Sequence, residues 1–263
     1  MIDTHCHLTY DGLYDRVEDV IAQARAHGVD RLISVGTSPD DAAKALSLSD
    51  RSPNVYATAG LHPHYAGTST DPAALKDGLR KLLAHPKAVA IGEMGLDHHY
   101  NDPPPQVQRA AFAAQLELMR EQAGGPFPRV GVIHNREATD DTLAMIADHG
   151  VDGSRLVFHC FTGSIAEVEQ ILAIGAMVSF TGITTFKGAA SVAQASDRVP
   201  LERLMIETDS PYLTPAPFRK VRPNEPRYVR HVAEFLAHRR GLSLDGFVAA
   251  VDANAERFFG LPA

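Results

Sequence analysis

Eight short apolar segments recur along the chain, and each is followed by a longer segment with a different pattern. The short segments are residues 2–5, 31–35, 55–59, 88–92, 129–133, 156–159, 176–179 and 204–207. Stretches such as RLISV, AVAIG and RLMIE are apolar at most positions, which is typical of strands buried on both faces of a parallel sheet. We therefore interpret the eight segments as parallel β-strands.

The intervening segments have the periodicity and the end signals of α-helices. Residues 17–24 place Val, Ile and Ala on one helical face, Ser38-Pro39 is a typical helix start, and Ser164-Ile-Ala-Glu167 reads as a capping box. Eight strand–helix units close naturally into a barrel. We predict an α/β fold, a (β/α)8 TIM barrel that forms a single domain over residues 1–263. The least regular stretches are interpreted as loops: residues 103–105, 124–128 and 214–226.

Ionisable side chains gather at the carboxyl ends of five of the predicted strands. They are His5, His7, Glu93, His134, His159 and Asp209. In a barrel the carboxyl ends of the strands meet at one face, where active sites lie. Because side chains alternate along a strand, His5 and His7 share one face and Cys6 points to the other. The pattern predicts a divalent-metal site built from these six residues.

Each of these residues has a simpler interpretation when it is taken alone. A histidine at a strand end is commonly a hydrogen-bonded core residue, Glu93 suits a salt bridge, and Asp209 suits a helix N-cap. Six such residues at equivalent positions favour a metal site, because burying polar groups without partners is costly. Four imidazoles and two carboxylates suit Zn, Mn or Fe, and open oxygen positions keep Mg among the candidates.

The composition narrows the class of protein. The net charge of −7 argues against a protein that coats nucleic acid, but bound divalent metals would add the local positive charge that a nuclease needs. Two cysteines in 263 residues form no disulfide framework. The N-terminus lacks a signal-peptide pattern, and no apolar run approaches the roughly 18 residues that span a membrane. We predict a cytoplasmic protein that makes no membrane contact.

Several longer motifs resemble those of one known family, the TatD-type deoxyribonucleases of the amidohydrolase superfamily. The matching segments are IDTHCHL at 2–8, GLHPH at 60–64, IGEMGLDHHY at 91–100, VIHNREA at 132–138, HCFTGS at 159–164, ETDSPYLTP at 207–215, RPNEPRYVRHVAE at 222–234 and NAERFFGL at 254–261. HxH alone is a weak signal, whereas HCFTGS together with ETDSPY and GExGLD is specific. Residues 124–129 depart from the family pattern, and we expect them to lengthen an outer loop at the N-terminal face of the barrel.

The resemblance implies a (β/α)8 barrel with one to three divalent ions and metal-dependent cleavage of nucleic-acid phosphodiesters, often from the 3′ end. Carried over to this chain, it assigns His5, His7 and Asp209 to one metal, and His134 and His159 to a second. Glu93 would bridge the two ions. The resemblance also implies that His62 contacts the substrate phosphate.

These assignments lead to a hypothesis for the reaction, a two-metal centre of Mg, Mn or Zn that activates a water for attack on phosphorus. Asp209 would orient the water and accept its proton, and Asp209 and Glu93 are therefore the predicted catalytic residues. The expected substrate is single-stranded DNA. Arg136 is the second candidate for substrate binding, through a forked contact with phosphate; the alternative is a salt bridge to Glu137 or Asp140.

Other residues near the predicted site are given lesser roles. We interpret Asp97 as a structural hydrogen-bonding residue, His64, His98 and His99 as loop residues, and both cysteines as small buried hydrophobes. A basic cluster after the last strand is a candidate for contact with the phosphate backbone, and four aromatic residues are candidates for base stacking. The basic cluster is Arg219, Lys220, Arg222, Arg227 and Arg230, with Lys187 near the seventh strand; the aromatic residues are Tyr65, Tyr100, Phe161 and Tyr212.

Three other functions stay open from the residues. The same metal centre would serve a hydrolase of small amides, lactones or esters, which suits the acidic net charge better. An enzyme that deacylates aminoacyl-tRNA would also hydrolyse an ester beside a nucleic acid. A non-enzymatic protein that binds metal or nucleic acid is disfavoured, because a binding protein has little use for an open metal centre.

Overall fold

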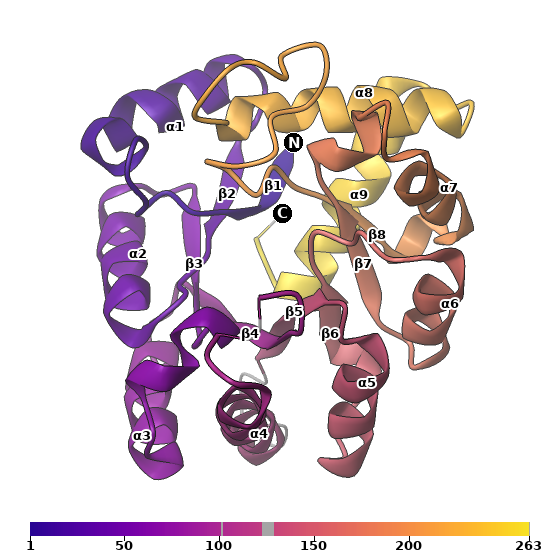
Figure 1. The fold of residues 1–263 in the computed structure, drawn as a ribbon. Coiled ribbons are helices and arrows are strands. Elements are labelled where there is room, and N and C mark those ends of the chain that lie inside the picture. The colour runs from indigo at the N-terminus through magenta and orange to yellow at the C-terminus, as the bar shows by residue number, and fades with distance from the viewer. Residues whose placement is uncertain (101, 123–128, 263) are drawn as a thin grey trace.

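Eight parallel strands form one sheet in the computed structural model, which describes residues 1–100, 102–122 and 129–262 (Figure 1). The sheet order follows the chain, and each strand pairs in parallel with the next. The strands are β1 (Ile2–Cys6), β2 (Arg31–Ser34), β3 (Val55–Ala59), β4 (Ala88–Asp97), β5 (Val130–Arg136), β6 (Leu156–Phe158), β7 (Met177–Phe180) and β8 (Leu204–Ile206). The predicted (β/α)8 barrel is confirmed.

The barrel closes between β1 and β8 through a short seam rather than a full ladder. An isolated parallel bridge joins Cys6 to Ser210 just beyond β8. The buried carboxylate of Asp3 accepts hydrogen bonds from the backbone N–H of Thr208 at 2.9 Å and from its hydroxyl at 2.6 Å. This seam links the first strand directly to the segment that carries Asp209.

Helices surround the sheet. They are α1 (Val17–Ala26), α2 (Pro39–Arg51), α3 (Pro72–Leu83), α4 (Pro105–Gln122), α5 (Thr139–Asp148), α6 (Ile165–Ala173), α7 (Ala190–Arg198), α8 (Val229–Arg239) and α9 (Leu244–Phe259). Both predicted helix starts are confirmed: Ser38 accepts a hydrogen bond from the Asp41 N–H, and Ser164 and Glu167 form a capping box. Short 3-10 segments lie at Tyr14–Arg16, Pro63–Thr68, Gly153–Arg155, Gly182–Thr185, Leu201–Arg203 and Pro226–Tyr228.

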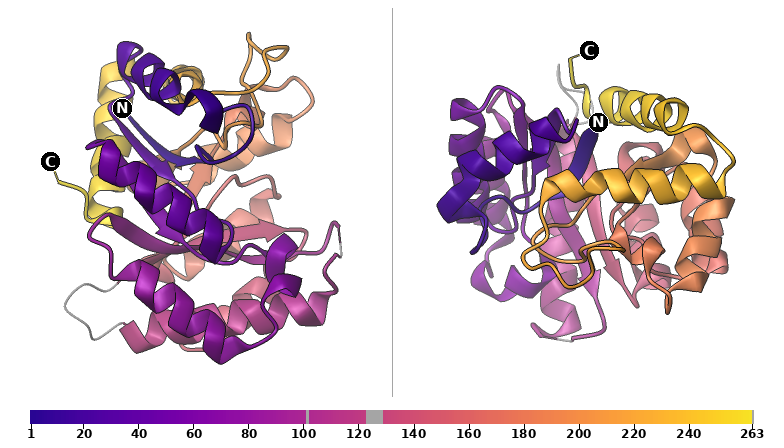
Figure 2. Two further views of the ribbon diagram at one scale, coloured as in Figure 1. Left: turned by 90° about the vertical axis from the view of Figure 1, so that its left-hand side faces the viewer. Right: turned by 90° about the horizontal axis from the view of Figure 1, so that it is seen from above.

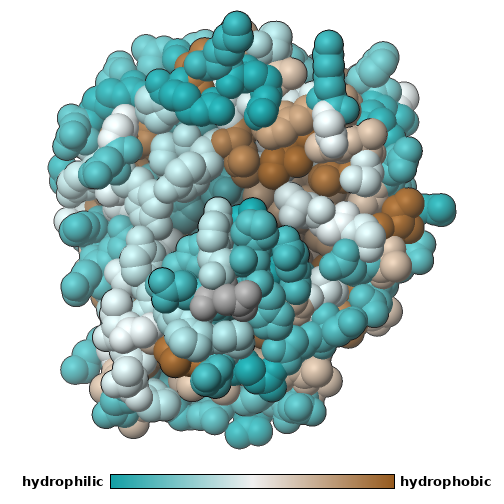
Figure 3. Space-filling view, in the orientation of Figure 1, coloured by the Kyte–Doolittle hydropathy of each residue, from teal (hydrophilic) through white to brown (hydrophobic). Residues whose placement is uncertain are grey.

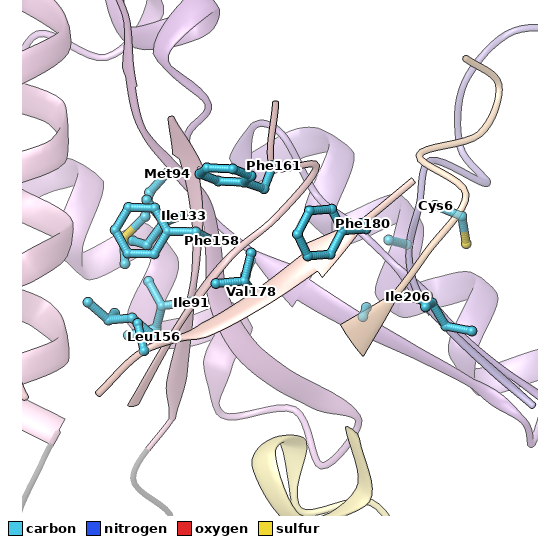
Figure 4. Packing of buried hydrophobic residues seen from close by; sticks show 14 of the residues in the cluster. Cys6, Ile91, Met94, Ile133, Leu156, Phe158, Phe161, Val178, Phe180 and Ile206 are labelled. Atoms are coloured by element: carbon cyan, nitrogen blue, oxygen red, sulfur yellow. The ribbon is translucent and has the colours of Figure 1, made fainter. Parts of the chain in front are cut away.

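The buried apolar residues form two layers. The larger layer lies between the sheet and the helices; Figure 4 shows part of it, including Ile91, Ile133 and Phe158. The smaller layer fills one end of the barrel and includes Ile33 and Met205. Phe259 and Leu261, at the end of α9 and just beyond it, pack against this smaller layer. In Figure 2 α9 lies on the side of the barrel away from the loop after β8. The amino ends of the strands are therefore covered, and the carboxyl ends face the loops.

Two strands are longer than the sequence pattern predicts. The pattern ends β4 at residue 92 and β5 at residue 133, but the two strands stay paired until Asp97 lies opposite Arg136. The register shifts between Ile91 and Met94, so that pairing continues past Glu93. Polar residues in this extension mask the strand pattern, because the predicted strands were recognised by their apolar runs.

Two further expectations concern the surface and the membrane. Residues 124–128, expected to lengthen an outer loop, lie outside the described residues. Among the described helices, none combines the length and the apolar character that a bilayer span requires.

Candidate metal centre

A cavity of 1410 Å³ opens at the carboxyl ends of the strands. Its lining residues lie within or after the strands of the barrel, from His7 after β1 to Leu213 after β8. Figure 3 looks onto this face and shows apolar side chains gathered over the loops after β7 and β8, with polar side chains over much of the remaining face. The described cavity therefore lies at the end of the barrel where the sequence placed the metal site.

The first half of the centre joins β1 to the segment after β8. The Nε2 atoms of His5 and His7 lie 3.3 Å apart, and both face Oδ1 of Asp209, at 3.7 and 3.2 Å. The backbone N–H of Asp209 donates to the carbonyl of His5 at 2.9 Å. The register of β1 shifts between Asp3 and Cys6, which lets Ile2 pack in the barrel interior while His5 also reaches the cavity side.

The second half of the centre is organised by the carboxylate of Glu93. Its Oε1 lies 2.9 Å from Nδ1 of His134 and 2.8 Å from Nε2 of His159. Its Oε2 faces the first half, 3.4 Å from Nε2 of His5 and 3.9 Å from Nε2 of His7. The structure thus brings all six predicted ligands together, and Glu93 lies between the two histidine pairs.

Burial and charge act against each other in this cluster. Burial by itself would raise the pKa of Glu93, but His159, His62 and His134 outweigh it and hold that pKa well below its usual range. Burial opposes protonation of His159, yet Glu93 and Glu207 raise its pKa well above the usual value. For His134, Asp97 and Glu93 overcome burial and also raise the pKa.

The donor set fits a divalent cation. Within the described residues, nitrogen and carboxylate oxygen atoms form three overlapping groups with all donor atoms less than 4.8 Å apart: His5, His159 and Asp209; His5, His7 and Glu93; His62, Glu93 and His134. Two imidazole nitrogens that face each other at 3.3 Å beside carboxylates can be held together by one proton or by a cation. Mixed imidazole and carboxylate donors suit Mn or Zn best.

His62 lies beside the second half of the centre as a hydrogen-bond donor. Its Nδ1 accepts from the backbone N–H of His64 at 3.0 Å, so Nδ1 has no proton and Nε2 carries it in the neutral ring. That Nε2 lies 3.2 Å from Oε1 of Glu93. Burial lowers the pKa of His62 to about 4, which keeps the ring neutral. A protonated Nε2 is suited to a phosphate oxygen rather than to a metal ion.

Two carboxylates behind the centre orient its histidines. Asp97 accepts the backbone N–H groups of His99 and Tyr100 and contacts Nε2 of His134 at 3.1 Å, which agrees with the hydrogen-bonding role expected of it. Glu207 contacts Nδ1 of His159 at 3.3 Å and accepts the N–H of Cys160. Carboxylates of this kind fix the tautomer and the ring angle of a ligand.

Glu207 was missed in the sequence because it stands inside the apolar run RLMIE and was counted as a strand residue. Its position two residues before Asp209, within the ETDSPY motif, was the available signal.

Arg136 lies on the cavity wall without the predicted alternative partners. Glu137 pairs with His99 at 2.7 Å, and Asp140 accepts from Gln170. The guanidinium lies 4.9 Å from the ring centre of Tyr100. Among the described residues the salt bridge to Glu137 or Asp140 is absent, so Arg136 is available to a ligand.

The two cysteines differ in burial. Cys6 is buried in the layer outside the sheet, as predicted. The prediction is wrong for Cys160, which is half-buried and lines the cavity because its left-handed backbone, with φ at 45°, breaks the alternation of the strand; its Sγ faces Thr181 at 3.8 Å. Burial raises the pKa of both thiols well above the usual value. The basic cluster lies outside the cavity lining; two of its members pair with Glu225 and Glu234.

Comparison with known proteins agrees with this geometry. The family model described as TatD related DNase matches residues 2–260. The metal-dependent hydrolase YabD of Bacillus subtilis, named as uncharacterized, is 36% identical over 261 residues, covering 98% of each chain. The protein named 3′-5′ ssDNA/RNA exonuclease TatD from Klebsiella pneumoniae is also 36% identical, over 99% of this chain and 98% of its own.

A solved structure shares the whole fold. The crystal structure of YjjV, a TatD homologue from Escherichia coli, superposes with a TM-score of 0.91 at 26% identity and covers 100% of this chain and 98% of its own. Relatives of equal identity carry the names of a nuclease and of an uncharacterized hydrolase, so identity alone does not separate the two. The chain belongs to the TatD-related DNase family and is a metal-dependent hydrolase.

Proposed function

We propose that this chain, acting as one barrel domain, is a nuclease that hydrolyses phosphodiester bonds of single-stranded nucleic acid from the 3′ end. The observation that carries the proposal is the position of Glu93, with one oxygen toward His134 and His159 and the other toward His5 and His7. Such a carboxylate is suited to join two cations. His5, His7 and Asp209 would hold one ion, and His134 and His159 the other.

The cations supply Lewis acidity at the phosphoryl group and a nucleophile at neutral pH when they are bound. The chain's own part of the reaction begins with Asp209. Burial alone would raise the pKa of this carboxyl, but His7 and His5 lower it, so that Asp209 is ionised at neutral pH. Its Oδ1 faces both histidines, and Oδ2 is assigned to accept the proton of the attacking water.

The substrate phosphate is assigned to His62 and Arg136. The neutral Nε2–H of His62 donates to a phosphoryl oxygen, and the guanidinium of Arg136 pairs with the phosphate from the cavity wall. As the water oxygen bonds to phosphorus, the bond from phosphorus to O3′ of the preceding nucleotide breaks. The products are a 5′-mononucleotide and a chain with a new 3′-hydroxyl.

The size of the cavity favours a polymer end over a small substrate. Sites for small molecules commonly enclose roughly 300–1,000 Å³, and this cavity measures 1410 Å³. Relatives named as exonucleases acting on ssDNA and RNA support the same substrate class. A hydrolase of small amides, lactones or esters is the second candidate, because the same donor set serves that chemistry.

The test is metal analysis of the purified protein followed by product mapping on a 5′-labelled single strand. We expect bound divalent metal and a ladder of products shortened from the 3′ end, which EDTA abolishes. A panel of lactones, amides and charged tRNA is assayed under the same conditions. Hydrolysis restricted to that panel, or tight oligonucleotide binding with no turnover, would overturn the proposal.

A further inference from the structure

Three exposed tyrosines surround the mouth of the cavity. Large apolar side chains are seldom exposed in the described chain, yet Tyr65, Tyr100 and Tyr212 are 42%, 58% and 53% exposed and all line the cavity. They follow β3, β4 and β8, and β4 lies across an eight-stranded barrel from β8. The exposed rings therefore stand on opposite sides of one opening.

The aromatic neighbours of these three rings meet them edge-on. Tyr65 meets His62 and Tyr212 meets Tyr10 in perpendicular contacts, with ring centres 6.3 and 6.4 Å apart. Tyr100 meets both His64 and His99 in perpendicular contacts, and the guanidinium of Arg136 lies over its ring. Among the described residues none of the three has a parallel aromatic partner. Tyr10, by contrast, is stacked on His7 with an interplanar angle of 22°.

The charges of the cavity limit how a nucleic acid can be held. Arg136 is the sole Arg or Lys among the described lining residues, which include five carboxylates: Glu93, Asp102, Glu137, Glu167 and Asp209. Two divalent cations and one arginine carry five positive charges, which only balance those five carboxylates. Non-specific affinity for nucleic acid normally comes from basic side chains along the phosphates, and the basic cluster lies outside this cavity. Little positive charge is left for phosphates beyond the one that reacts.

We propose that Tyr65, Tyr100 and Tyr212 form a base-stacking mouth, which binds a nucleic-acid end through its unpaired bases rather than through its backbone. This inference rests on the proposed nuclease function and names the feature that the enzyme recognises. Every base has an aromatic face, so stacking tolerates any sequence. Paired bases are covered by their neighbours, so a duplex end is bound poorly until it frays.

The first test measures oligonucleotide binding by fluorescence anisotropy, and KM on the same strand, for alanine variants of the three tyrosines. Each stacked base contributes enough affinity that we expect Kd and KM to rise about 5- to 100-fold for Tyr212→Ala or Tyr100→Ala. Tyr212→Phe, which keeps the ring, should restore most of the affinity. Tyr14→Ala is the matched control, because Tyr14 is 39% exposed but lies outside this cavity. Thermal unfolding confirms that each variant is folded.

The second test removes the bases and keeps the backbone. An oligonucleotide with abasic sites at its last three positions should bind the unmodified protein weakly, and Tyr212→Ala should weaken that binding no further. A plot of log affinity against log salt should have a slope of about −1.4 or less in magnitude, as for one or two phosphates.

The outcomes separate this inference from the nuclease proposal. Metal-dependent cleavage combined with equal affinity for abasic and normal strands, or with a salt slope near −3, would overturn base recognition and leave the nuclease standing. Unchanged binding in all three alanine variants would overturn it as well. Failure to bind or cleave any oligonucleotide would overturn both.

Discussion

The two ends of this barrel are built from the same strands and have opposite chemistry. At the amino ends, Ile33 and Met205 pack with Phe259 and Leu261 in an apolar layer that α9 covers. At the carboxyl ends, buried imidazoles and carboxylates surround an open cavity. The comparison shows how a barrel separates stability from function. Burial of apolar side chains stabilises one end, whereas at the other end the unfavourable burial of polar side chains must be offset by a specific ligand.

The physical difference lies in what burial does to each set of side chains. Removing apolar surface from water stabilises the closed end by roughly 25 cal/mol per Å². Removing the Glu93 carboxylate and the neighbouring imidazoles from water is unfavourable. Their mutual attraction offsets part of this cost, and it lowers the pKa of Glu93 while it raises that of His159. A divalent cation among these donors would complete that compensation.

The largest expected effect is at the carboxyl end, in the variant Glu93→Gln. The amide keeps the volume but cannot join two cations, so turnover should fall at least about 1,000-fold and bound metal should decrease. Turnover and metal content are measured on the same preparation. Glu169→Gln, an exposed carboxylate on α6, is the matched control. Normal turnover with normal metal content in Glu93→Gln would contradict the assignment.

At the closed end, Phe259→Ala should affect stability instead of chemistry. Phe259 is buried, and removing a buried phenyl ring lowers the free energy of unfolding by about 3 kcal/mol or more, roughly 150-fold in the unfolding equilibrium. Urea unfolding measures this change, and activity per folded molecule should be unaltered. Phe218→Ala, at an exposed position, should lower stability by less than about 1 kcal/mol. Equal losses in the two variants would contradict the comparison.

A smaller effect is expected from Glu207→Gln, which acts on the centre through His159. Weakening the contact to Nδ1 of His159 should lower metal affinity about 10- to 100-fold while the fold persists. Competition with a chromogenic chelator measures this affinity. The control is Glu202→Gln, an exposed carboxylate five residues earlier. If both variants bind metal equally well, Glu207 has no orienting role.

The last test leaves every residue unchanged and shifts the pH. Despite burial, carboxylate neighbours raise the pKa of His159, His134 and His7, so these rings hold protons that a metal must displace. Metal affinity should therefore fall as the pH drops through these raised pKa values, by roughly tenfold per unit for each displaced proton. Calorimetry in buffers of different ionisation enthalpy counts the protons released. Affinity that is constant from pH 6 to 8, with no proton release, would exclude this competition.

The sequence by itself was sufficient for the barrel, for two helix caps and for the six candidate ligands. Apolar runs locate the buried strands. Ser38 and Ser164 each cap a helix through a hydrogen bond to a residue three positions later, and the carboxyl ends of parallel strands meet at one face of a barrel. Each of these inferences depends on local pattern or on a general rule of topology. The family motifs implied that Glu93 bridges two ions, and in the structure its carboxylate lies between the two histidine pairs.

Tertiary structure alone decided which groups touch. The tautomer of His62 depends on the backbone of His64, the partner of His159 is the residue that follows β8, and the basic cluster lies outside the cavity. Strand register and its shifts aim these side chains, and register is set by contacts between segments far apart in the chain. Residue type thus determined which chemistry was available to this protein, and long-range packing determined which atoms perform it.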